Sequence, residues 1–182
     1  MRDYFVEQAD YQRWACAELF HSLDILSDDQ RRADVGLFFK NIHKTVDHIL
    51  VVTRNWKARL AGEFGKVTGY DVLLYNDWQK LKHAVLDEFT NLGMWLSEKQ
   101  PDWFNETIEY PGSGGKMKRV AVADGLIHIM THAVHHRGQI SAVCTRLGAP
   151  SPEMDFVFYA VQGRTNAAGD RKSGAARWRR QI

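Results

Sequence analysis

Apolar side chains recur at three- and four-residue steps through four long segments of this chain, which occupy residues 4–26, 38–60, 78–96 and 122–147. This spacing gathers apolar side chains along one side of an α-helix and so predicts four amphipathic helices. The fourth segment is apolar on several faces, and we therefore expect it to lie at the centre of the molecule. The sequence predicts an all-α fold.

Glycine and proline mark the ends of these segments. Gly62 and Gly148 stand where a left-handed C-terminal cap forms most easily, and Pro101 cannot continue a helix. Between residues 101 and 120 the apolar period changes to two, which predicts a small β-hairpin before the fourth helix. The stretch PGSGG at its centre lacks the Gly-Lys-Ser/Thr ending of a phosphate-binding loop, so we interpret it as a turn. A short last helix is expected over residues 154–161.

The length of 182 residues suits one domain with one apolar core, and 45% hydrophobic residues with 25% charged residues is ordinary for a globular protein. We assign residues 1–163 to this domain and residues 164–182 to a flexible tail. The tail holds six Lys or Arg against one Asp, a local charge of +5, whereas the whole chain carries only +2. The domain itself is therefore slightly acidic, which argues against a nucleic-acid-binding fold.

The sequence gives little indication of secretion, membrane insertion or disulfide bonding. No apolar run approaches the roughly 20 residues needed to cross a bilayer, and the start MRDYFVEQADY lacks the features of a secretion signal. We therefore expect a cytoplasmic protein without membrane contact. Its two cysteines, Cys16 and Cys144, are far apart in sequence, and we expect reduced, buried thiols rather than a disulfide or a thiolate zinc site.

The fourth segment contains the stretch HIMTHAVHHRGQ, with imidazoles at His128, His132, His135 and His136. Residues four apart on an α-helix lie about 40° apart around the axis and about 6 Å apart along it, so His132 and His136 can point at one ion. A lone histidine on a helix is more often satisfied by a backbone carbonyl. Several imidazoles in one apolar segment would be costly without partners, which favours a metal site.

Two ligands on one helix bind weakly, so a third must come from another element. His48, in the second segment, is the best candidate. Its neighbours His43 and Asp47 could instead serve as a ligand or as an acceptor for a ligand ring, and spacing alone does not choose among them.

The sequence resembles the DinB-like (DinB/YfiT) superfamily of metalloproteins almost from end to end. The matching stretches are YQRWA at 11–15, NIHKTVDHILVVTRNWKARLAG at 41–62, THAVHHRGQI at 131–140 and PEMDFVFYAVQ at 152–162. The resemblance implies an up-down-down-up four-helix bundle, commonly a homodimer, with one divalent metal, often nickel or zinc. It implies His48, His132 and His136 as the metal ligands, and places His128 and His135 beside the site.

A metal with three protein ligands keeps open positions and can activate water or a thiol. The resemblance therefore suggests a metal-dependent hydrolase or an S-transferase that uses a low-molecular-weight thiol. The alternative is a non-catalytic protein in which the metal has a structural or sensing role. Arg137 or Asp47 could orient a substrate or a ligand ring, although a structural ion pair or capping role is favoured for Arg137. The aromatic residues Tyr11, Trp14 and Trp56 could line a pocket, but their spacing makes them core residues first.

Overall fold

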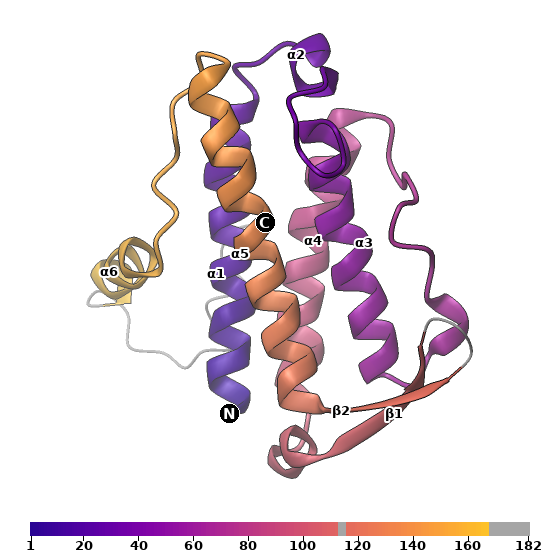
Figure 1. Ribbon diagram of the computed structural model, residues 1–182. Coiled ribbons are helices and arrows are strands. Elements are labelled where there is room, and N and C mark those ends of the chain that lie inside the picture. The colour runs from indigo at the N-terminus through magenta and orange to yellow at the C-terminus, as the bar shows by residue number, and fades with distance from the viewer. Residues whose placement is uncertain (113–115, 168–182) are drawn as a thin grey trace.

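The computed structural model describes residues 1–112 and 116–167. Four long α-helices lie side by side (Figure 1): α1 (Arg2–Leu23), α3 (Ile42–Leu60), α4 (Trp78–Ser97) and α5 (Val122–Arg146). Two shorter helices, α2 (Asp28–Arg32) and α6 (Phe156–Ala167), and two 3-10 turns, η1 (Phe64–Lys66) and η2 (Pro101–Asn105), complete the helical part. The chain is thus mostly helical, as the apolar periodicity predicted.

The core lies between the four long helices. Both α1 and α3 pack against α4 and α5. Each helix contributes side chains with 1% or less of their surface exposed, for example Leu19, Ile49, Phe89 and Ile129. Burying the apolar side of each helix in this way supplies most of the stabilisation that such helices need, since isolated helices are marginal in water.

The helix ends follow local capping rules. Ser27 and Gln30 form a reciprocal capping box that starts α2, Asn41 accepts from the Lys44 N–H at the start of α3, and Asp77 caps α4. The predicted left-handed caps are confirmed, because Gly62 has φ of 74° and Gly148 has φ of 85°.

The start of the second long helix was predicted too early. It begins at Ile42, four residues after Phe38, whose side chain is 78% exposed. The preceding residues form a turn in which Leu37 and Lys40 make an isolated bridge and Lys40 adopts φ of 72°. The next aromatic ring, Phe39, is the one that is buried.

A small two-stranded sheet precedes α5, as expected. β1 (Thr107–Pro111) pairs antiparallel with β2 (Met117–Ala121), with Ile108 opposite Val120. Part of the predicted turn, residues 113–115, lies outside the described residues. So does most of the predicted tail, although α6 continues to Ala167, past the predicted start of that tail.

Both cysteines are free and buried, as predicted. No helix in the described parts of the chain combines the length and apolar character that crossing a membrane requires.

Candidate metal centre

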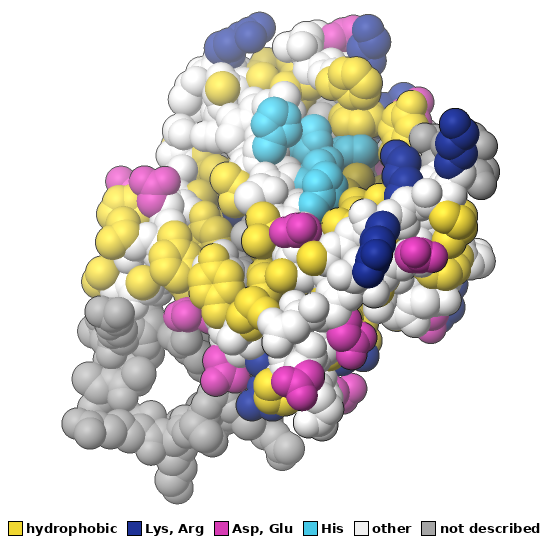
Figure 2. All heavy atoms as spheres, turned by 60° about the horizontal axis from the view of Figure 1, so that its bottom comes forward, with side chains coloured by type: hydrophobic (Ala, Val, Ile, Leu, Met, Phe, Trp, Pro, Cys, Tyr) yellow, Lys and Arg dark blue, Asp and Glu magenta, His cyan; other side chains and the backbone are white. Residues whose placement is uncertain are grey.

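Three histidines from two helices meet between α3 and α5. The Nε2 atom of His132 lies 3.1 Å from Nε2 of His48 and 3.1 Å from Nε2 of His136. The potential ligand atoms of the three residues all lie within 4.8 Å of one another. We call His48, His132 and His136 the histidine triad. Figure 2 shows histidine side chains gathered in one group on a face of the molecule; within the triad, His132 is half-buried, and His48 and His136 are buried.

Hydrogen bonds at Nδ1 of His48 and His136 determine where the Nε2 lone pairs of these two rings point. Nδ1 of His48 lies 2.9 Å from the carbonyl oxygen of Tyr70, and Nδ1 of His136 lies 2.8 Å from Oε1 of Gln139. Because these oxygens only accept hydrogen bonds, each Nδ1 carries the proton. In the neutral rings of His48 and His136, Nε2 therefore presents its lone pair toward His132.

Burial keeps the triad uncharged at neutral pH. Burial, followed by the charges of the neighbouring histidines, lowers the pKa of His132 to about 3. Burial also lowers the pKa of His136 to about 4, and it lowers the pKa of His48. Neutral imidazole is the form that binds metals.

The triad fits a divalent transition-metal ion on two grounds. Two nitrogens about 2.05 Å from one ion are about 2.9 Å apart at a right angle and about 3.3 Å apart at the tetrahedral angle, and the 3.1 Å separations fall between these values. In addition, a neutral His132 can offer Nε2–H to only one of the two lone pairs that face it. A cation at the centre would satisfy all three nitrogens at once.

The connection between α3 and α4, residues 61–77, is tied to α3 on both sides of Tyr70. On one side, buried Asn55 accepts from the Thr68 N–H and donates to the Thr68 carbonyl, each at 2.9 Å. On the other, the Asp47 carboxylate accepts from the backbone N–H groups of Leu74 and Tyr75, also at 2.9 Å. These contacts hold the Tyr70 carbonyl against His48, as an acceptor that orients a ligand ring should be held.

The observed geometry places His43 and Asp47, the two alternatives that spacing left open, outside the triad. The structure places His43 outside the triad, with its Nε2 atom 2.7 Å from the carbonyl oxygen of Tyr75. Asp47 acts on the connection rather than on a ligand ring directly. Sequence reasoning gave no signal for Asn55 or Tyr70.

Comparison with known proteins identifies the family of this chain. Residues 1–167 match the DinB family. The chain belongs to the DinB family. It is also 22% identical, over 176 residues, to a protein of Bacillus subtilis (strain 168) named Protein DinB, and the similarity covers 92% of this chain and 100% of that protein. The resemblance inferred from the sequence motifs is therefore confirmed.

Aromatic and histidine rings surround the triad of this DinB-family protein. Phe39 stacks on His48 with ring centroids 3.9 Å apart. His128 lies 5.4 Å from His132, and His135 lies 4.9 Å from His136, both measured between ring centroids. Both flanking histidines are exposed, and neither joins the group of converging ligand atoms.

The other residues singled out from the sequence fall on two sides of the protein. Arg137 is 1% exposed and donates from Nη1 to Oε1 of Gln12 at 2.6 Å, which ties α5 to α1 and gives it a structural position. Tyr11 and Trp14 pack with Tyr159 of α6, so they belong to the contact between α1 and α6. Only Trp56 lies near the triad, with its ring 4.9 Å from that of His128.

Proposed function

We propose that this DinB-family protein is a metal-dependent enzyme that binds one divalent transition-metal ion, nickel or zinc, through His48, His132 and His136. The observation that carries this proposal is the approach of three imidazoles, with Nε2 of His132 3.1 Å from Nε2 of both His48 and His136. Imidazole nitrogens suit both metals, and supply and geometry select between them. The reaction we propose is hydrolysis, or transfer of a low-molecular-weight thiol to an electrophile.

The surroundings of the triad support a catalytic rather than a closed site. An ion held by three histidines retains positions for water or a thiol, lowers the pKa of that group and supplies a nucleophile at neutral pH. In the described residues the group of converging ligand atoms contains no cysteine or carboxylate as a fourth ligand. His132 is only half-buried, which leaves the triad accessible to a small molecule.

Metal content tests the ligand assignment. The full chain, purified without added metal, is expected to contain one equivalent of metal by elemental analysis. Alanine substitution of any triad residue is expected to reduce this content strongly, whereas His135→Ala, a matched control on the same helix, retains it. A triad variant with full metal content would remove that residue from the ligand set.

Activity tests the catalytic proposal separately. The metal-loaded protein is incubated with an electrophile and with bacillithiol, mycothiol or glutathione, and thiol consumption is followed. In the expected transfer the thiol loses its proton to solvent, its sulfur forms a bond to carbon, and the leaving group departs with the electron pair of the broken bond. Inactivity with all thiols and hydrolytic substrates, combined with a metal that exchanges no water, would favour the structural or sensing alternative.

We also infer that the four long helices form an up-down-down-up bundle. The short α2 segment joins α1 to α3, whereas the long 61–77 connection lies between α3 and α4 (Figure 1). A connection of this length lets two consecutive helices run in the same direction, because the chain must return along the bundle before the second one starts.

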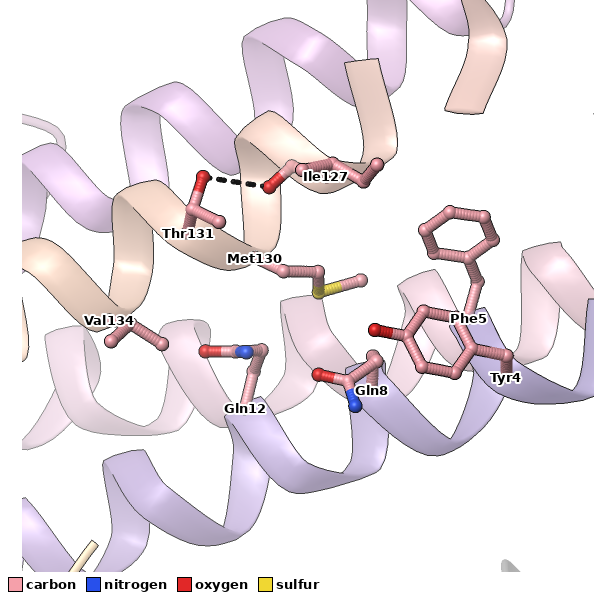
Figure 3. Close-up of a pocket in the computed structure, with 8 residues that line it drawn as sticks. All are labelled: Tyr4, Phe5, Gln8, Gln12, Ile127, Met130, Thr131 and Val134. Carbon is pink, nitrogen blue, oxygen red and sulfur yellow. Dashed lines mark hydrogen bonds between the residues drawn. The ribbon is translucent and has the colours of Figure 1, made fainter. Parts of the chain in front are cut away.

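We further propose a homodimer that uses the groove between α1 and α5. Figure 3 shows this groove, which is lined by Tyr4, Phe5, Gln8, Gln12, Ile127, Met130, Thr131 and Val134. The side chains of Tyr4, Ile127 and Val134 are 57%, 48% and 46% exposed, an apolar surface that a second copy would cover. Sedimentation of wild type and Ile127→Glu tests this, with a dimer expected to become a monomer; a monomeric wild type would contradict it.

A further inference from the structure

A second group of side chains extends from the histidine triad along α3 and α5. The ring of His128 lies 5.4 Å from that of His132, and the ring of Trp56 lies 4.9 Å from that of His128. Tyr110, on β1, closes the far side with its ring 5.5 Å from Trp56. The group therefore joins the proposed metal centre to the β-hairpin.

Arg59 lies at the end of this group, between two aromatic rings. Its guanidinium carbon is 5.3 Å from the centroid of Trp56 and 5.5 Å from that of Tyr110. Cations are attracted to ring faces, and an arginine stacked on a ring keeps its N–H edge available for other partners. The rings of Trp56 and Tyr110 thus hold the guanidinium in place without occupying its hydrogen-bond donors.

No acidic group neutralises Arg59 in the described residues. Its Nε atom is buried and has no hydrogen-bond partner, and no carboxylate there lies within 4.0 Å of its guanidinium. By contrast, Arg54, on the same helix, is paired with Glu88 at 3.0 Å. A partly buried guanidinium without an anionic partner costs free energy, which a bound anion would offset.

Close packing of α3 on α5 sets the position of this cation. At Gly125 of α5, a Cβ atom would lie 3.1 Å from Leu60 and 3.4 Å from the Trp56 ring. The absence of a side chain at Gly125 therefore lets Trp56 lie against α5, next to His128. Arg59 follows Trp56 by one turn of α3 and is brought to the same end of the site.

We propose that Arg59, flanked by Trp56 and Tyr110, binds a carboxylate of the substrate whose reactive group lies at the histidine triad. This proposal rests on the proposed function and names its substrate class, an extended molecule with a carboxylate at a distance from the reacting atom. The planar guanidinium matches a carboxylate with two parallel hydrogen bonds, which gives orientation as well as affinity.

The first test uses a matched pair of thiols. Glutathione and glutathione diethyl ester share the same sulfur and backbone, but only glutathione carries carboxylates. Binding of each to the cobalt-loaded full chain is followed by the thiolate-to-cobalt absorption band. We expect glutathione to bind about tenfold more tightly than the ester, since a charge-assisted hydrogen-bonded pair is lost in the ester.

Substitution of Arg59 tests whether this residue causes the preference for glutathione over its ester. In Arg59→Gln the ratio of the two affinities is expected to fall to about one, and Arg59→Lys is expected to keep part of it. Arg119→Gln, which removes an equal charge from exposed strand β2, is the control and should keep the full ratio. An equal affinity of wild type for both thiols, or an undiminished ratio in Arg59→Gln, would overturn the proposal.

A second measurement separates this proposal from that of the metal-dependent function. The Nε–Hε NMR signal of Arg59, identified by its disappearance in Arg59→Gln, is followed during titration with succinate and with neutral succinamide. A saturating shift with succinate alone supports the carboxylate subsite even if neither thiol binds to cobalt, in which case only the thiol-transfer part of the proposed function fails. An unchanged signal with succinate refutes the subsite.

Discussion

Asn55→Ala should weaken metal binding although Asn55 does not touch the histidine triad. The buried Asn55 amide forms two hydrogen bonds of 2.9 Å with the backbone of Thr68, and these fix the connection that presents the Tyr70 carbonyl to His48. Each bond contributes about 1 kcal/mol, so the substitution should lower the free energy of unfolding by about 2 kcal/mol. Loss of a group that orients a ligand ring typically costs about tenfold in metal affinity.

Two assays separate these effects. Urea unfolding of the metal-free protein measures stability, and competition with a chromophoric zinc chelator measures affinity. Thr68→Ala is the matched control, because Asn55 binds the backbone of residue 68 and the substitution removes only the longer 3.3 Å contact from Oγ1. If Asn55→Ala lost stability but bound zinc as tightly as wild type, the 61–77 connection would not orient His48.

Two further predictions concern pH and packing. The pKa values of about 3 and about 4 for His132 and His136 lie below the ordinary 6.5, so between pH 4 and 6.5 the unfolded chain binds more protons than the folded one. Metal-free protein should therefore lose stability as pH falls through this window; urea unfolding at several pH values measures this, and a flat profile would contradict burial of the triad. On α5, Gly138→Ala meets no atom within 4 Å and should stabilise the helix by about 1 kcal/mol. Gly125→Ala crowds Leu60 and Trp56, so thermal unfolding should show it less stable than Gly138→Ala by about 1–3 kcal/mol.

Helical periodicity predicted the long helices because each buries one apolar side, but it misplaced one helix start. Phe38 continues the apolar repeat and is nevertheless exposed, since Asn41 caps α3 and the residues before it turn. A repeat records which residues are apolar and not where the backbone leaves the helix. Capping side chains such as Asn41 carry that information.

The four-residue spacing on α5 predicted that His132 and His136 lie together, but spacing alone does not select this pair. His128 precedes His132 by the same four residues that separate His132 from His136. The packing of α3 distinguishes the two pairs, because it brings His48 to His132 and His136. On α3 itself, five residues separate His43 from His48, or about 140° around the axis, so the two rings face different ways.

The contacts that complete the site join residues with no shared sequence signal. Tyr70 lies in an irregular connection 22 residues from His48, and the stacking ring of Phe39 precedes α3. Arg59 and Tyr110 meet only because the hairpin folds over the end of α3. Such contacts depend on how the helices and connections are arranged, which periodicity does not encode.

Nitrogen-15 NMR of the histidine rings during zinc titration tests the metal centre most directly. We expect Nε2 of His48, His132 and His136 to shift together and to saturate at one equivalent of zinc, while Nδ1 of His48 and His136 stays protonated. Shifts confined to His43, His128 or His135, or no shift at one equivalent, would show that the three lone pairs do not share an ion.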